Sequence, residues 1–192
     1  LTVTSNAANG PHTVNLAGTG VASASFAANV AAVVTGYYET ILGRAPDAGG
    51  LTFWSAEATR VTGLGADVRE VFFAMSMSFF GSAEYGLRNR TDTEFLTDMY
   101  RTFFLRDPDG PGLAFWQGEL TAIGSRSALL NSFLFSAEFS GQMTSLFGAT
   151  AVRPELDMTV DLFRGVLGRL PDSDGFAFWL GRIRQAQCLG AS

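Results

Sequence analysis

Residues 43–54 read Gly-Arg-Ala-Pro-Asp-Ala-Gly-Gly-Leu-Thr-Phe-Trp, and the chain contains two further copies of this pattern. Residues 105–116 read Leu-Arg-Asp-Pro-Asp-Gly-Pro-Gly-Leu-Ala-Phe-Trp, and residues 168–179 read Gly-Arg-Leu-Pro-Asp-Ser-Asp-Gly-Phe-Ala-Phe-Trp. The copies start 62 and then 63 residues apart. Self-similarity at a fixed period is typical of a repeat architecture, so we predict about three related units.

Each recurring residue type has a structural task in this pattern. Arg follows a helix end, where a cation complements the helix dipole and can pair with the Asp across the turn. Pro prevents the helix from continuing, Asp is placed to cap the next helix, Gly permits a close helix crossing, and Trp fills the core one turn later. The predicted structural motif comprises Arg44, Pro46, Asp47, Gly50, Trp54, Arg106, Pro108, Asp109, Gly112, Trp116, Arg169, Pro171, Asp172, Gly175 and Trp179.

The hydrophobic period predicts a mainly α fold, a helical repeat bundle over residues 23–192 with units at about 26–88, 91–150 and 154–187. The period is about 3.6 residues from Ser25, which is expected as an N-cap. Helices are expected from there to Gly43, from after Asp47 to near Gly63 and Gly65, and over about 66–80. The third helix is rich in Phe and Met, too many for one face, so part of it is expected at an interface. The third unit has no third helix, so we expect a partner or a longer parent chain to cover its apolar face.

The first 22 residues have a different pattern. Leu1 and Val3, then Val14 and Leu16, alternate with polar residues around an Asn-Gly-Pro turn, which predicts a short β-hairpin or strand segment. An isolated hairpin is marginal in water, so these strands are expected to pack on the chain's own helices or to pair with a neighbouring subunit as assembly strands. A chain that opens in mid-strand is interpreted as a processed product or a fragment.

Composition restricts the classes of function. All 13 basic residues are Arg, and the chain has one His (His12) and one Cys (Cys188), which disfavours Schiff-base chemistry, a zinc site and a Cys–His nucleophile pair. The net charge of −5 argues against a nucleic-acid partner, and the longest apolar run, Val71 to Phe80, is too short to span a bilayer. We predict no catalytic residues, no metal site, no cofactor and no membrane span.

The phrase Leu-Gly-Arg-x-Pro-Asp, the following Gly-Leu-x-Phe-Trp and a later Ser-x-Glu-Phe resemble the bacterial domain of unknown function 4214 over about residues 26–187. That family is similar to the helical linker domains of phycobilisomes, and its members occur as repeats in secreted and surface proteins. The resemblance implies helical units and an extracellular or cell-surface location in a bacterium. Leu105 stands where the family pattern has Gly. Residues 1–21 resemble the last strands of Ig-like repeats of the choice-of-anchor D type.

These features predict a non-catalytic extracellular structural or interaction module. It would assemble with itself, as a homo-oligomer or filament, or mediate surface-layer or adhesin contacts with another surface protein. The alternative is a glycan- or calcium-binding module, because Trp and Phe lie beside Asp and Arg in the repeated loops. Asp107 with Asp109, and Asp172 with Asp174, alternate as calcium ligands often do, although the first copy has Asp47 alone.

Overall fold

The computed structural model describes residues 23–188, which form ten α-helices and one short π-helical segment, labelled η1. No strand occurs among these residues, and the predicted mainly α fold is confirmed. The hairpin predicted for residues 1–22 lies outside the described residues, as do its assembly residues Leu1, Val3, Val14 and Leu16. The elements are α1 (Ser23–Tyr37), η1 (Tyr38–Leu42), α2 (Ala48–Gly63), α3 (Arg69–Phe80), α4 (Ala83–Leu87), α5 (Asp92–Phe103), α6 (Gly110–Ile123), α7 (Arg126–Leu134), α8 (Ala137–Phe147), α9 (Pro154–Leu167) and α10 (Ser173–Cys188).

Local sequence signals explain where most helices begin. Thr91 precedes α5 and forms a capping box with Glu94, in which each residue's side chain accepts from the other's backbone N–H. Hydroxyl groups of three serines, Ser82, Ser125 and Ser136, cap α4, α7 and α8 by accepting from the backbone N–H three residues later. Because capping depends on neighbours three residues away, these starts could be predicted from the sequence.

Two helix boundaries differ from the prediction. Helix α1 begins at Ser23, so Ser25 lies inside the helix and is not its N-cap. Helix α3 begins at Arg69, since the preceding Asp67 accepts from the Arg69 N–H at 2.8 Å and holds residues before it in a turn. The helix that was expected to end at Gly43 ends in the wider π-helical turn of η1.

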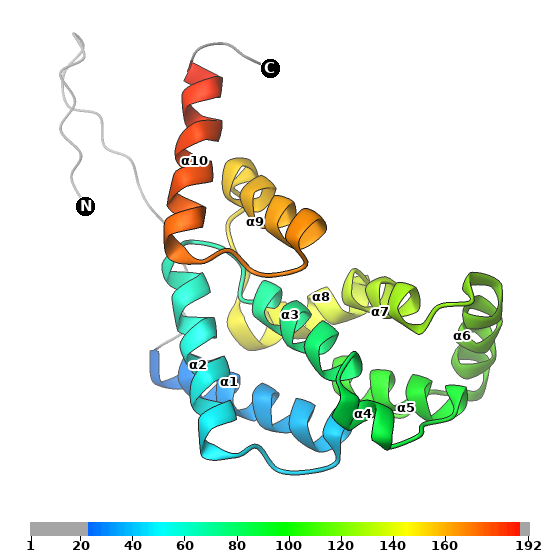
Figure 1. The fold of residues 1–192 in the computed structure, drawn as a ribbon. Helices are drawn as coiled ribbons and strands as arrows, with labels where there is room; N and C mark the ends of the chain where they lie inside the picture. The colour runs from blue at the N-terminus through cyan, green and yellow to red at the C-terminus, as the bar shows by residue number, and fades with distance from the viewer. Residues whose placement is uncertain (1–22, 189–192) are drawn as a thin grey trace, which may run out of the picture.

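Helix α3 lies at the centre of the molecule (Figure 1) and contacts α2, α4, α7 and η1. The six aromatic and Met residues that crowd it are all buried or packed against the core, namely Phe72, Phe73, Met75, Met77, Phe79 and Phe80. A helix that is surrounded on most sides needs apolar residues on most sides. Phe73, Met77 and Phe80 are only partly buried, and the expectation that part of this stripe belongs to an interface stays a prediction.

The first and second units contact each other at equivalent positions. Thr40 in η1 and Thr102 in α5 are 62 residues apart, which is the repeat period, and their hydroxyl oxygens lie 2.8 Å apart. Each hydroxyl is also hydrogen-bonded to the carbonyl oxygen four residues earlier. The equivalent helices α3 and α7 contact each other as well. Contact between identical positions indicates a local two-fold relation between these two units.

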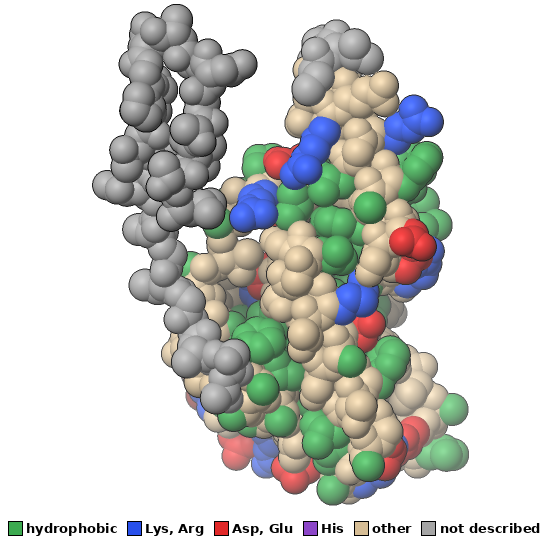
Figure 2. Space-filling view, turned by 90° about the vertical axis from the view of Figure 1, so that its left-hand side faces the viewer, with side chains coloured by type: hydrophobic (Ala, Val, Ile, Leu, Met, Phe, Trp, Pro, Cys, Tyr) green, Lys and Arg blue, Asp and Glu red, His purple; other side chains and the backbone are tan. Residues whose placement is uncertain are grey.

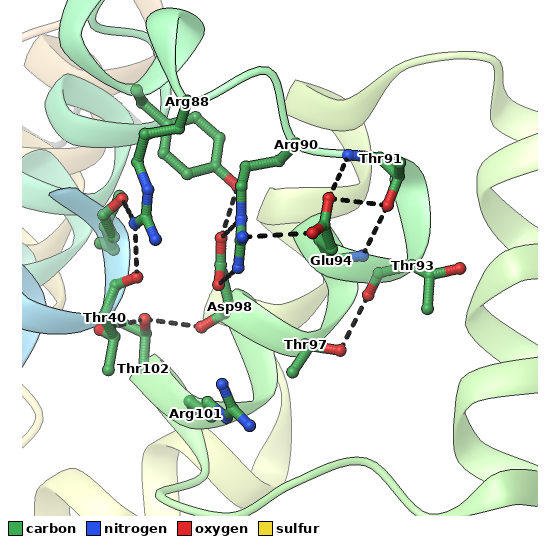
Figure 3. A network of polar contacts seen from close by, with 12 residues as sticks. Thr40, Arg88, Arg90, Thr91, Thr93, Glu94, Thr97, Asp98, Arg101 and Thr102 are labelled. Atoms are coloured by element: carbon green, nitrogen blue, oxygen red, sulfur yellow. Dashed lines mark hydrogen bonds and ion pairs between the residues drawn. The ribbon is translucent and has the colours of Figure 1, made fainter. Parts of the chain in front are cut away.

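A polar network joins the end of the first unit to the start of the second (Figure 3). Asp98 of α5 is buried, and Arg90 donates to its two carboxylate oxygens at 2.8 and 2.6 Å. The Tyr85 hydroxyl of α4 donates to the same carboxylate at 3.1 Å, and burial raises the pKa of Tyr85. Arg88 donates to the last carbonyls of η1, including that of Thr40 at 3.0 Å, which terminates the π-helical turn.

The third unit consists of α9 and α10, which pack against each other at one end of the molecule (Figure 1). Arg60 of α2 donates to the carbonyl oxygen of Pro171 at 2.8 Å. Arg164 of α9 forms an ion pair with Glu70 of α3 and lies 4.9 Å from the ring centre of Phe73. These contacts attach the third unit to α2 and α3.

Candidate functional site

Each repeated loop begins with a residue in the left-handed backbone conformation. Gly43, Leu105 and Gly168 have φ of 71°, 56° and 62°, and each ends the preceding helix. Leu105 therefore adopts the same turn as the two glycines, although a residue with a Cβ pays a steric cost there. The helix stop is preserved in all three units.

The Asp of each loop caps the helix that follows. Asp47, Asp109 and Asp172 accept from the backbone N–H three residues later at 2.7, 2.6 and 2.8 Å. The pKa values of Asp47 and Asp172 are lowered, and the largest cause is the hydrogen bond that the charged carboxylate accepts from the glycine N–H. The three prolines lie between the Arg and the Asp of each loop; Pro46 and Pro108 are half-buried and Pro171 is buried.

The Arg of each loop pairs with this Asp and lies over an aromatic ring. The Arg–Asp separations are 3.5, 3.9 and 3.1 Å for Arg44, Arg106 and Arg169. Their guanidinium carbons lie 5.0, 4.9 and 5.2 Å from the ring centres of Tyr38, Tyr100 and Phe163, respectively. The aromatic residue lies six positions before the Arg in all three units, so it belongs to the repeated motif too.

The aromatic ring also explains the repeated Gly. A Cβ on Gly50 would overlap the Tyr38 hydroxyl, and a Cβ on Gly112 would lie 2.5 Å from the Tyr100 hydroxyl. A Cβ on Gly175 would lie 3.0 Å from Cζ of Phe163. The absent side chain thus makes room for an aromatic ring rather than for a crossing helix, which corrects the predicted role of these glycines.

Two glutamates that the sequence analysis did not assign complete the site in the first two units. Glu84 accepts from Nε and Nη2 of Arg44 at 2.5 and 3.1 Å, and Arg44 lowers the pKa of Glu84. Glu138 accepts from the same atoms of Arg106 at 2.9 and 3.2 Å. Both glutamates belong to the repeated Ser-Ala-Glu sequence, so the signal was present. Paired hydrogen bonds of this type fix the relative orientation of the two helices.

The tryptophans are less buried than predicted. Trp54 packs on Phe79 of α3 at 6.0 Å between ring centres, and Trp116 packs on Phe133 of α7 at 4.4 Å. Both are half-buried. Trp179 is 43% exposed, so it does not fill the core as expected. The reason is that no helix equivalent to α3 or α7 lies on it among the described residues.

Three of the four paired aspartates that were expected as calcium ligands make other contacts. Asp107 pairs with Arg101 at 2.5 Å, and Asp109 caps α6. Asp172 accepts from a backbone N–H and from Arg169. Within the described part of the chain, no group of three or more His, Cys, Asp and Glu side chains is placed to hold a metal ion. Nor is any described helix both long and apolar enough to cross a membrane.

Residues 73–143 match the family described as Domain of unknown function (DUF4214). The matched stretch begins within α3 and ends within α8, so it contains most of the second unit and both Ser-Ala-Glu sequences. No curated protein and no solved structure matches the chain. The family match supports the predicted domain over this stretch, and its description assigns no activity.

An exposed apolar surface distinguishes the third unit from the first two. On α9, Met158, Leu162 and Val166 are 54%, 39% and 72% exposed. Their counterparts 63 residues earlier are the buried core residues of α5, namely Phe95, Met99 and Phe103. Figure 2, which faces α2 and α10, shows hydrophobic side chains gathered beside arginines in its upper part. The same repeated pattern that builds the core in one unit is therefore open to solvent in another.

A second exposed feature recurs in all three units. Phe53, Phe115 and Phe178 are 56%, 58% and 55% exposed, and each contacts the tryptophan that follows it. The nearly equal exposure shows that the fold keeps this phenylalanine at the surface each time. No core packing explains these three residues, which makes them candidates for contacts with a partner or ligand.

Proposed function

We propose that this chain is a non-catalytic structural or interaction module of a secreted or surface-exposed bacterial protein. In this role it assembles with copies of itself or with another surface protein. The observation that carries the proposal is the exposed stripe of Met158, Leu162 and Val166 on α9. Large apolar patches on a soluble chain usually mark interaction sites, because their burial releases ordered water at little cost.

The absence of catalysis is part of the proposal, and the use of the repeated polar residues supports it. Asp47, Asp109 and Asp172 serve as helix caps, and the three repeated arginines pair with them and lie over aromatic rings. Groups that act as acids, bases or nucleophiles must be available to a substrate. These groups are instead engaged in joining helices.

The finer details of the proposal come from sequence resemblance. The likeness to phycobilisome linker domains favours a role in joining subunits, and the Ig-like pattern of residues 1–21 favours a bacterial surface location. Alternating apolar residues in the first 22 positions favour pairing with the sheet edge of a neighbour. Under this proposal, assembly uses two surfaces, the N-terminal strands and the exposed face of the third unit.

Sedimentation velocity over a concentration series tests the proposal. The wild-type chain is compared with Val166→Glu, which places a charge at the most exposed residue of the α9 stripe, and with Leu87→Glu. Leu87 is 87% exposed on α4, far from the stripe in sequence, and serves as the matched control. A third protein lacks residues 1–22.

We expect wild type and Leu87→Glu to form concentration-dependent oligomers, while Val166→Glu associates about tenfold more weakly or not at all. A loss of large species on removal of residues 1–22 would assign the strands to assembly. Monomers at every concentration, for every protein, would refute self-assembly. Equal association of wild type and Val166→Glu would show that the α9 stripe is not the interface.

A glycan-binding module is the alternative that one observation favours. A groove of about 560 Å³ lies between the first unit and the third loop, and its lining combines aromatic and charged side chains, among them Phe53, Trp54, Glu57, Arg60 and Asp172. Sugars commonly bind where an aromatic face adjoins hydrogen-bonding groups. Tryptophan fluorescence titrated with oligosaccharides and with calcium tests this alternative. A saturable change that Phe53→Ala abolishes would support it over self-assembly.

A further inference from the structure

In the second unit, one short segment packs on the aromatic residues and the arginine of the repeated loop. Phe133 at the end of α7 lies 4.4 Å from Trp116 and 5.5 Å from Tyr100, measured between ring centres. Six residues later, Phe139 packs on Phe103 at 5.5 Å. Between them, Glu138 holds Arg106 through two hydrogen bonds. The segment 133–139 reads Phe-Leu-Phe-Ser-Ala-Glu-Phe.

The first unit repeats this arrangement with its own copy of the segment. Residues 79–85 read Phe-Phe-Gly-Ser-Ala-Glu-Tyr. Phe79 packs on Tyr38 at 4.7 Å and on Trp54 at 6.0 Å, and Glu84 holds Arg44. The shared pattern is Phe-x-x-Ser-Ala-Glu-aromatic, in which the serine caps the second helix. Two independent copies thus use their Phe and their Glu for the same contacts.

Among the described residues, no copy of this segment covers the equivalent loop surface of the third unit. Trp179, Val166 and Leu167 are 43%, 72% and 54% exposed, whereas Phe103 and Phe104, the counterparts of Val166 and Leu167, are buried. The ion pair that the described residues give Arg169 is with Asp172. Because the loop geometry of the third unit matches the other two, its surface is already shaped for the same segment.

We propose that the surface formed by Val166, Leu167, Arg169 and Trp179 docks a helical segment of the type Phe-x-x-Ser-Ala-Glu-aromatic from a partner chain. The partner's Phe would lie on Trp179, and its Glu would pair with Arg169. Both copies of the segment in this chain are already engaged, with Arg44 and with Arg106, so a folded second copy has no free one to offer. A folded second copy is thereby excluded, and we assign the docked segment to a partner chain in which a segment of this type is unpaired.

The two parts of the contact have different tasks. The Arg–Glu pairs in the first two units are partly exposed, with side chains 41–44% accessible, and such pairs add little affinity. Burial of Trp179 and Val166 supplies the affinity, since aromatic anchors dominate docking sites. The pairing of Arg169 with a carboxylate at one position fixes the register of the docked helix. An apolar cavity of about 680 Å³ beside Arg169, lined by Phe73, Met77 and other residues, offers further apolar surface.

The test uses a synthetic peptide of residues 126–147 as the probe and isothermal titration calorimetry with the full chain. Because a free peptide helix of this length is marginal, a second protein carries the same peptide after Ser192 through a flexible linker, which raises its local concentration to the millimolar range. In the linked protein, acrylamide quenching reports the combined exposure of the three tryptophans, of which Trp179 is the most exposed. Arg182→Ala, which removes an exposed arginine from the same helix α10, is the matched control.

We expect peptide binding that Phe133→Ala in the peptide weakens by about tenfold or more. Arg169→Glu should weaken binding of the unchanged peptide, and a peptide with Glu138→Arg should restore it; Arg182→Ala should bind as wild type does. In the linked protein, Arg169→Glu should remove the protection of Trp179 from acrylamide, and adding Glu138→Arg in the linked peptide should restore it. Equal binding of all charge variants would overturn the proposal, as would the absence of both binding and protection.

This inference rests on the branch of the proposed function in which the chain joins another surface protein, and it can fail separately from self-assembly. If Val166→Glu abolishes self-association while the peptide neither binds nor protects Trp179, the chain assembles through α9 without the segment type proposed here. If the peptide binds and the chain remains monomeric, the docking site stands and self-assembly is wrong.

Discussion

Replacement of Leu105 by Gly should stabilise the protein, because Leu105 occupies a turn that suits glycine. Its φ is 56°, within the left-handed region, and the equivalent residues of the other units are glycines at 71° and 62°. A residue with a Cβ pays about 1–2 kcal/mol in this conformation, and glycine returns about 0.5–1 kcal/mol through the greater entropy of the unfolded chain. Leu105 is 66% exposed, so its side chain contributes little burial. The expected net gain is about 0.5–1 kcal/mol.

Urea denaturation followed by circular dichroism measures this gain. The midpoint temperature of thermal unfolding should rise by about 1–4 °C. Leu105→Ala is the matched control, because it shortens the side chain but keeps the Cβ and should give no gain. Gly168→Ala is the reverse experiment. No atom lies within 4 Å of the added Cβ. We expect Gly168→Ala to lower the free energy of unfolding by about 1 kcal/mol, and this loss reports the backbone conformation alone.

The reasoning would be refuted if Leu105→Gly destabilised the protein, or if Leu105→Ala stabilised it as much as Leu105→Gly. The first result would mean that the Leu105 side chain contributes more packing than its exposure indicates. The second would mean that side-chain size, and not φ, sets the cost. A neutral Gly168→Ala would show that the left-handed turn is not required in the third unit.

Three further predictions concern charged groups. Arg90→Ala should lower the free energy of unfolding by about 3–5 kcal/mol, since it leaves the buried Asp98 carboxylate without its ion pair; urea denaturation measures this. Glu70→Gln should change stability by less than about 1 kcal/mol in the same assay, because burial raises the pKa of Glu70 despite its pairing with Arg164. The pKa of Asp172 is lowered in the folded protein, so Asp172 stabilises the fold above about pH 4, and this stabilisation is lost as the pH falls through the folded pKa. On acidification, the urea midpoint of Asp172→Asn should therefore fall less than that of the wild type.

Controls for these predictions come from exposed groups. Arg101→Ala removes a pair with Asp107 in which both side chains are more than half exposed, and it should cost less than about 1 kcal/mol. A similar loss for Arg90→Ala and Arg101→Ala would contradict the role given to the Asp98 network. A large loss for Glu70→Gln would show that attraction to Arg164 outweighs desolvation at this site.

Short-range features of this protein could be predicted from the sequence, and long-range ones could not. Thr91, Ser82 and Asp109 cap helices through groups three residues away, so the pattern alone locates them. Glu84 lies 40 residues after Arg44, whereas Glu138 lies only 32 after Arg106. The Arg–Glu pair that both units share could not be recognised from spacing, because the lengths of the elements between the Arg and the Glu differ in the two units.

The role of the repeated glycines was missed for a related reason. Gly50 and Gly112 lie in the first turn of a helix, where the lack of a Cβ could equally permit a close helix crossing. The aromatic ring that fills the space beside each glycine belongs to the preceding helix. Only the folded arrangement brings Tyr38 over the first turn of α2. Likewise, the exposure of Trp179 depends on which helix lies next to it, and no local pattern reports a neighbour.

The local symmetry of the described units gives a physical reason for assembly. The first and second units meet at Thr40 and Thr102, two copies of one position, and such a contact is closed because each unit satisfies the other. The equivalent position in the third unit is Gly165, which is exposed between the exposed residues Leu162 and Val166. A surface that is self-complementary in one pair of units and open in the third can be buried only by a further chain segment. The apolar stripe of α9 therefore follows from the repeat itself, and its burial is the step by which the module would join a larger assembly.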